Sequence, residues 1–293
     1  MAFIGSPAAS DTLHAAHGAK EDLFASLLHH VQDSHYLELF GMKIELPHLP
    51  SFVVGGITFD MSITKHVVFL WVAAALLILM AVIVARKNAR RDVPRGFGNL
   101  VELMILFVRD EIIMPNMGPA GVKYLPYLLT TFFYILLMNL LGLIPYGASA
   151  TGNVNVTAGL AIIAFVMIQA AAVRAQGWKH YLAHLTGGVH WILWPIMIPI
   201  EILGLFTKPF ALCIRLFANM TGGHIVLVSL IGLIFIFKSY AIAIAPASFV
   251  VAINFLELFV AVLQAYIFTM LTSLFMGLGM QAEGHEAAEG HGH

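Results

Sequence analysis

VHWILWPIMIPIEILGLFTKPFALCIRLFANMTGGHIVLVSLIGLIFIF is the sequence of residues 189–237, and a second long apolar run follows at residues 239–280. A helix needs only about 20 residues to cross the hydrocarbon core of a bilayer, so each run exceeds one perpendicular crossing. Prolines inside the first run and Pro246 in the second can kink a helix without ending the apolar pattern. The two runs therefore predict two long, tilted, near-horizontal helices that form a hairpin in a membrane.

The composition of the whole chain agrees with a membrane location. Of its 293 residues, 60% are hydrophobic and 11% are charged, whereas a soluble globular chain carries about 25% charged residues. These values exclude a water-soluble domain, a disordered chain and a coiled-coil rod. The net charge of −1 provides no basic field for nucleic acid. Cys213 is the single cysteine, which excludes an intrachain disulfide and a cysteine-based metal site.

Three shorter apolar runs precede the long ones, so the fold class is an all-α integral membrane protein with about five membrane helices. These runs are residues 67–85, 125–144 and 154–173. Five basic residues follow the first run closely: Arg86, Lys87, Arg90, Arg91 and Arg95. By the positive-inside rule this end lies in the cytoplasm. Residues 97–114 then mix apolar and charged side chains as an interfacial helix on the cytoplasmic surface does.

The chain divides into three parts by polarity. Residues 1–64 are predicted to be a retained extramembrane segment on the periplasmic side. It contains an amphipathic stretch at 23–31 and short extended pieces at 43–60. Residues 65–282 form the membrane domain, and residues 283–293 form a disordered, His-rich cytoplasmic tail.

Charged side chains inside the long apolar runs are the strongest functional signal. The only acidic residues between the interfacial helix and the tail are Glu201 and Glu257, and both lie within these runs. The first long run also contains Lys208, Arg215 and His224. A charged side chain at mid-bilayer costs roughly 2.5 to 3.5 kcal/mol on insertion scales, so it needs a partner or a water-filled cavity. The hairpin is therefore predicted to contain an aqueous ion path.

The spacing of the polar residues predicts two stripes that face each other. Residues seven apart on a helix drift only about 20° per step from a common face. The first stripe consists of Glu201, Lys208, Arg215 and, one turn further, Asn219. The second stripe consists of Asn254, Glu257 and Gln264.

The charged and titratable residues of the first long run are not equally strong candidates for a functional role. The guanidinium of Arg215 stays charged at any accessible pH, which makes it the strongest candidate. Lys208 is equally compatible with function and with snorkelling to a water-filled cleft. His224 lies about 180° from Arg215 on an ideal helix. Either the Gly222-Gly223 pair alters the local winding, or His224 lines a separate compartment.

The segment KPFALCIRLFANM at residues 208–220 closely resembles the segment around the essential arginine in subunit a of F-type ATP synthases. Four further motifs follow the family's order: VPRGF at 93–97, MNLLGLIP at 138–145, NVNVT at 153–157 and LQAYIF at 263–268. Chance similarity among apolar helices would not reproduce their polar positions. The resemblance covers roughly residues 62–279.

The resemblance implies a role for the arginine and its neighbours. Arg215 would be the stator arginine that faces a carboxylate on each subunit of the rotating c-ring. Asn219 and Gln264 match its polar neighbours. The implied partners are the c-ring, subunit b of the peripheral stalk and, indirectly, the F1 sector.

The resemblance also implies a proton path. Glu201 matches a carboxylate of the outer access path. His224 and Glu257 stand where other members carry an acid and a histidine in the opposite order, so the pair is exchanged and not lost. Gly142 stands where some members have an acid. The sequence leaves open whether the coupled ion is H⁺ or Na⁺.

The implied function is that of a non-catalytic proton-channel subunit in a bacterial plasma membrane. Two half-channels would lead to and from the c-ring carboxylate and couple proton flow to ring rotation and ATP synthesis. No Gly-rich phosphate-binding loop with its lysine is present, and neither a cofactor nor a metal is expected.

Two other classes of function compete with this one. A self-contained secondary transporter would show an internal repeat with interrupted helices in both halves, and no such repeat is found. A structural subunit of a respiratory complex would pair its charges internally. The two seven-residue stripes argue against that arrangement.

Overall fold

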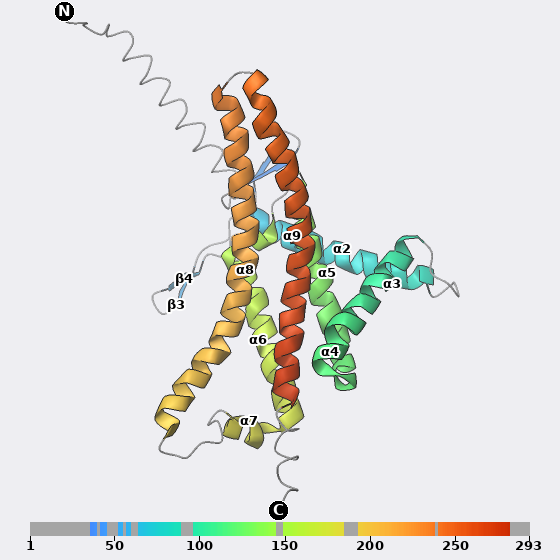
Figure 1. The fold of residues 1–293 in the computed structure, drawn as a ribbon, viewed down its shortest axis with the longest axis vertical. Helices are drawn as coiled ribbons and strands as arrows, with labels where there is room; N and C mark the ends of the chain where they lie inside the picture. The colour runs from blue at the N-terminus through green and yellow to red at the C-terminus, as the bar shows by residue number, and fades with distance from the viewer. Residues whose placement is uncertain are drawn as a thin grey trace, which may run out of the picture.

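The computed structural model shown in Figure 1 describes the membrane helices and four short strands. The described residues are 36–39, 42–45, 52–54, 57–59, 64–88, 96–144, 149–184, 193–237 and 240–281. The predicted amphipathic stretch at 23–31 and the predicted tail at 283–293 lie outside them.

The strands form two separate hairpins before the first long helix. β1 (Tyr36–Leu39) pairs with β2 (Met42–Glu45), and β3 (Phe52–Val54) pairs with β4 (Ile57–Phe59), both antiparallel. The short extended pieces predicted at residues 43–60 are therefore present. The first hairpin begins earlier than predicted, at Tyr36.

Among the described residues, five helices are long and apolar enough to cross a membrane, as predicted. They are α2 (Lys65–Asn88), α5 (Leu125–Gly142), α6 (Val154–Gln176), α8 (Trp194–Phe237) and α9 (Tyr240–Gln281). Both ends of α6 have the capping residues that are usual for a helix. The side chain of Asn153 accepts a hydrogen bond from the N–H of Asn155 at the start of α6. Gly177, with a φ of 77°, ends that helix.

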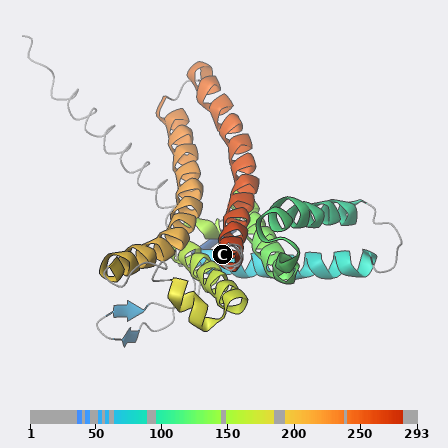
Figure 2. The same cartoon turned by 60° about the horizontal axis from the view of Figure 1, so that its bottom comes forward.

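The two last helices form the predicted hairpin. α8 has 44 residues and α9 has 42, and each continues through its internal prolines. They lie side by side along the long axis of the molecule, whereas α2 runs across that direction (Figures 1 and 2). α8 bends in its N-terminal part, which contains Pro199 and Pro209. Because α2 is long and apolar enough to cross the membrane, a hairpin that runs across the direction of α2 agrees with the predicted near-horizontal course.

The predicted interfacial helix at 97–114 is interrupted in the structure. α3 (Phe97–Phe107) passes into a π-helical turn, η1 (Val108–Ile113), and then into the short helix α4 (Met114–Met117). The 3₁₀ helix η2 (Pro119–Tyr124) leads into α5. The wide turn was not predicted, because no sequence pattern distinguishes a π-turn from an α-turn.

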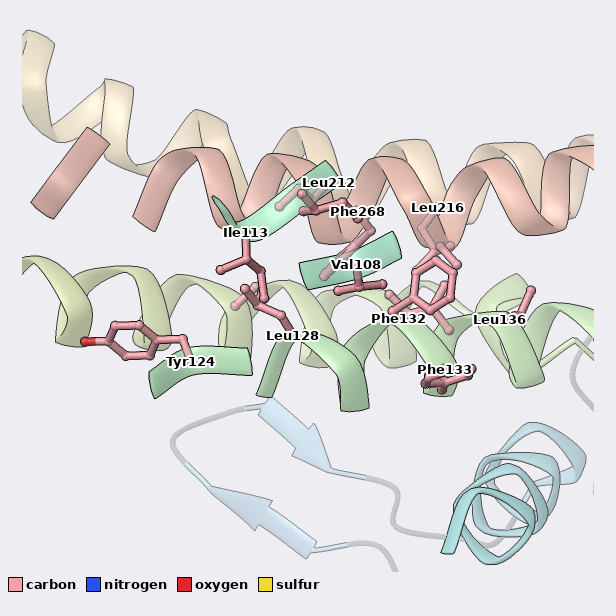
Figure 3. Packing of buried hydrophobic residues seen from close by; sticks show 14 of the residues in the cluster. Val108, Ile113, Tyr124, Leu128, Phe132, Phe133, Leu136, Leu212, Leu216 and Phe268 are labelled. Carbon is pink, nitrogen blue, oxygen red and sulfur yellow. The ribbon is translucent and has the colours of Figure 1, made fainter. Parts of the chain in front are cut away.

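The core lies where α5, α8, α9 and η1 meet. Figure 3 shows that Phe132 of α5, Leu212 and Leu216 of α8, Phe268 of α9 and Val108 of η1 converge there. All five side chains are buried. This packing fixes the rotation of α8 and α9, and with it the direction of their polar residues.

Candidate functional site

Arg215 lies on the surface of the hairpin. Leu212 and Leu216 on the same helix are buried in the core, so they hold the arginine on another side of α8, where it is exposed. Within the described part of the chain, Arg215 forms neither an ion pair nor a side-chain hydrogen bond. A permanent charge in this position is directed away from its own chain.

The structure brings Asn219 and Gln264 together across the hairpin. The side-chain amide of Asn219 donates a hydrogen bond of 2.8 Å to Oε1 of Gln264. Gln264 is 2% exposed, whereas Asn219 is exposed. One turn beyond Arg215, the two stripes therefore face each other.

Glu257 is buried against the backbone of α8. A side chain at Gly223 would collide with Oε1 of Glu257, so the carboxyl group occupies the space that this glycine leaves open. Glu257 is 9% exposed, and its Oε2 has no hydrogen-bond partner among the described residues. An unpartnered buried carboxyl oxygen is costly and marks a functional site.

His224 faces the start of α2. It is half-buried and interacts electrostatically with His66 and Lys65, in the first turn of that helix. α8 remains helical through Gly222-Gly223, so altered winding does not turn His224 toward Arg215.

Glu201 lies in the N-terminal part of α8, within electrostatic reach of the short helix α7 (Trp178–His184). Burial, followed by the negative charge of Glu201, raises the pKa of Tyr181 in α7. The hydroxyl of Tyr181 donates a 2.5 Å hydrogen bond to Oε1 of Gln169 on α6. Tyr181 and Gln169 are thus hydrogen-bonded to each other, and the charge of Glu201 acts on this pair.

The position of Glu201 differs from the expectation that it shares one path with His224 and Glu257. The 23 positions between Glu201 and His224 correspond to about 35 Å along a helix. The seven-residue spacing predicted that the residues of the first stripe share one face of α8. It does not predict that they lie at the same depth in the membrane. Glu201 therefore belongs to a different part of the site.

Lys208 contacts the neighbouring helix. Its Nζ lies 5.1 Å from the centroid of the Phe275 ring of α9, which is a cation–π contact. The side chain is half-buried. This contact joins the two helices of the hairpin.

A buried hydrogen-bond network beside the site was not predicted. It runs between α2, α5, α9 and η3 (Ala150–Gly152). Nδ1 of His66 lies 3.0 Å from the backbone carbonyl oxygen of Ser149. The side-chain Oγ of Ser149 lies 2.7 Å from Oγ1 of Thr151. Thr151 donates to Oδ1 of Asn139, and Asn139 donates to the carbonyl of Ala261 on α9. Asn139 could have been found as an amide inside an apolar run, whereas His66 at a helix start carries no such signal.

The same network accounts for Gly142. A side chain at this position would collide with Cβ of Ser149 and approach its backbone. An acid there, as in some members of the family that the sequence resembles, would displace the segment that holds Ser149. Cys213 is buried, and its Sγ lies 3.4 Å from Oγ1 of Thr157. The described residues contain no group of three side chains suited to a metal.

Comparison with known proteins gives one family. The model of the family described as ATP synthase A chain matches residues 67–277. ATP synthase subunit a 2 of Prosthecochloris aestuarii is 48% identical over 302 residues, with 99% of this chain and 91% of the relative covered. Subunit a of Chloroherpeton thalassium is 51% identical, with 91% and 79% covered. Subunit a of Myxococcus xanthus is 52% identical, with 80% and 78% covered.

Proposed function

The chain belongs to the ATP synthase A chain family, and from this premise we propose that Arg215 separates two proton paths that open on opposite sides of the membrane. The protein is the proton-translocating, non-catalytic subunit a of a bacterial ATP synthase, a multi-pass membrane protein that assembles with other Fo and F1 subunits. One observation carries the proposal. Glu201 interacts with α7 and His224 with the start of α2, and Arg215 lies between them on α8.

The path of Glu201 opens to the cytoplasm. Arg86 and Lys87 lie in the last turn of α2, and Arg174 lies in the last turn of α6, so these ends face the cytoplasm by the positive-inside rule. α7 follows α6 at the same end, and Glu201 lies beside it. This position supports Glu201 as the carboxylate of the inner path and replaces its expected place on the outer one.

The path of His224 and Glu257 opens to the periplasm. The first turn of α2 lies at the end opposite Arg86 and Lys87, and His224 interacts electrostatically with that turn. Glu257 lies against Gly223, the residue before His224. In this arrangement the two titratable groups pass protons from the periplasm to a c-ring carboxylate. The plasma membrane of a bacterium, with the segment before α2 in the periplasm, fits this orientation.

Arg215 acts on the carboxylate that the ring presents. Its exposed guanidinium would favour the ionised form of that carboxylate by about 1 to 3 pKa units, so a proton arriving with the ring is released toward Glu201. The Asn219–Gln264 pair supplies neutral polar contacts beside it. The membrane potential provides about 2.3 kcal/mol per proton for each 100 mV. The c-ring is thus the partner of this face, and subunit b joins the complex to the peripheral stalk.

The test is Arg215→Lys in the assembled ATP synthase. A compact ammonium does not reproduce a planar guanidinium, so we expect ATP-driven proton pumping into inverted membrane vesicles to be abolished while the complex still assembles. Arg174→Lys, near the end of α6, is the matched control and should pump as wild type does. Pumping by Arg215→Lys near the wild-type rate would refute the assigned role.

A further inference from the structure

The short 3₁₀ helix η3 is connected to α9 by buried hydrogen bonds. The side chains of Thr151 in η3 and of Asn139 on α5 are both 0% exposed. The hydroxyl of Thr151 donates a 2.7 Å hydrogen bond to Oδ1 of Asn139. The amide nitrogen of Asn139 donates a 3.2 Å hydrogen bond to the backbone carbonyl of Ala261 on α9. Asn139 therefore carries the connection from η3 through α5 to α9.

Each hydrogen bond in this connection has one possible direction. The carbonyl of Ala261 only accepts, so the NH₂ group of Asn139 faces it and Oδ1 faces Thr151. The hydroxyl of Thr151 has a single proton and donates it to Asn139. Oγ of Ser149, 2.7 Å from Oγ1 of Thr151, must then be the donor in that bond. Because no member can reverse its role, the buried groups hold one another in a single arrangement.

η3 is also connected to α8. The two elements pack against each other, and the hydroxyl of Thr221 on α8 donates a 3.4 Å hydrogen bond to the carbonyl of Gly152 in η3. Thr221 lies two residues after Asn219 and two residues before Gly223. The connection therefore reaches α8 between the two residues at which this helix meets the polar side chains of α9.

On α9 the connection has the same relation to the site. Ala261 follows Glu257 by four residues and precedes Gln264 by three, so it lies about one helical turn from each. Gln264 accepts the hydrogen bond of Asn219, and Glu257 lies against Gly223. η3 is thus joined to both helices of the hairpin at the level of these two contacts.

We propose that Thr151 is a positioning residue for proton transfer, which acts through Asn139 to set the register of α9 along α8. Hydrogen bonds within a helix do not resist sliding, because they stay intact when the whole helix moves. Contacts between helices do resist it. A shift of α9 would move the Glu257 carboxyl group away from Gly223 and separate the two amides of the hairpin. This inference rests on the proposed function and adds to it a residue that does not itself bind the proton.

The first test removes the hydroxyl of Thr151. Thr151→Val puts a methyl group in its place and leaves Oδ1 of Asn139 without its donor, whereas Thr151→Ser keeps the hydroxyl. Misplacement of a reacting group by about 1 Å can cost 100-fold in rate, so we expect ATP-driven pumping by assembled Thr151→Val to fall at least about tenfold. Thr151→Ser should restore pumping to near the wild-type rate.

Thr269→Val is the matched control. Thr269 is also 0% exposed, but its hydroxyl donates to the carbonyl of Ala265 in its own helix. Its removal breaks no connection between helices, so this variant should pump as wild type does. Thr221→Val breaks the connection of η3 to α8 and should lower pumping. The proposal is overturned if assembled Thr151→Val pumps at the wild-type rate, or if neither Thr151→Val nor Thr221→Val assembles.

A double-mutant cycle separates positioning from a general loss of stability. The methyl group of Gly223→Ala displaces the Glu257 carboxyl group directly. If Thr151 acts through the position of that carboxyl group, then adding Thr151→Val to Gly223→Ala should lower pumping little further. Independent effects would multiply, so two tenfold losses would give about 100-fold. A multiplied loss would refute the positioning role.

Arg215→Lys, measured in the same membranes, distinguishes failure of this inference from failure of the proposed function. If Arg215→Lys abolishes pumping while Thr151→Val pumps as wild type does, only the role of Thr151 is refuted. If Arg215→Lys pumps normally, the proposed function itself fails.

Discussion

Arg215 and Glu257 belong to the same hairpin but differ in their exposure to the surroundings. The guanidinium cannot lose its charge, and it lies exposed, where another chain can reach it. The carboxyl group is buried with one oxygen unpartnered, and it can remove its own charge by binding a proton. The exposed residue therefore needs a partner, whereas the buried residue needs a supply of protons.

Gly223 leaves the space in which the Glu257 carboxyl group lies. We expect Gly223→Ala to displace this flexible carboxyl group, because the added methyl group would occupy its position. Folding should change little, since alanine favours a helix by about 1 kcal/mol over glycine. Misplacement of a reacting group by about 1 Å can cost 100-fold in rate, so pumping should fall at least about tenfold.

Gly222→Ala is the matched control for this variant. A side chain at Gly222 meets open space, so its pumping should equal that of wild type. Both rates are measured in inverted vesicles and divided by the amount of assembled complex. Equal pumping by the two variants would show that the position of the carboxyl group does not limit proton transfer.

At the level of the elements, α9 joins the parts of the molecule. It packs against α5, α6, α8 and α4. Small residues permit this close approach, as is usual for helices in membranes. Gly277 is the extreme case, because a side chain there would collide with the backbone carbonyl of Asn116 in α4. The end of α9 is thus fixed against the segment that follows the π-helical turn.

Gly277→Ala should destabilise the protein. Backbone atoms cannot move aside as a side chain does, so α4 and α9 must separate, at about 1 to 3 kcal/mol for an overpacked contact. The melting temperature of the purified complex should fall. Gly204→Ala in α8, where nothing lies within 4 Å, should leave it unchanged. A melting temperature of Gly277→Ala equal to that of the control would contradict this account of the contact.

The short helix α7 makes a prediction about alkaline pH. Burial and the Glu201 charge raise the pKa of Tyr181 in the folded protein. The unfolded chain therefore loses this proton first, near pH 10. The contribution of Tyr181 to the free energy of unfolding is therefore fully present below about pH 10. It is lost as pH rises through the pKa of Tyr181 in the folded protein.

Tyr181→Phe tests this linkage. The variant loses the hydrogen bond to Gln169, so its melting temperature at neutral pH should be lower. It should then fall less steeply than that of wild type above about pH 10, because no phenol ionises. Parallel curves for the two proteins would show that Tyr181 contributes nothing to the alkaline transition.

For the whole molecule, the sequence predicts what depends on local patterns. Run length and charge predicted the five long helices and the hairpin. Helical spacing, one turn from Arg215 to Asn219 and seven residues from Glu257 to Gln264, predicted that Asn219 and Gln264 lie on facing stripes. Spacing did not predict the depth of Glu201, because spacing defines a face of a helix but not which neighbour covers it; its expected place on the outer path came from the resemblance alone. The His66 network joins segments more than 80 residues apart, and no local pattern reports such a contact.

The length of the hairpin has a consequence for direction. A helix of 44 residues is about 66 Å long, more than twice the roughly 30 Å thickness of the hydrocarbon core. Such a helix must lie strongly tilted, so most of the separation between Glu201 and His224 is sideways. In the proposed function, the entry and exit of a proton are then offset laterally in one sense only, because the chain has a single handedness. In that proposal a mirror-image hairpin would drive the rotor the opposite way, so the tilt of the two helices would set the sign of the torque.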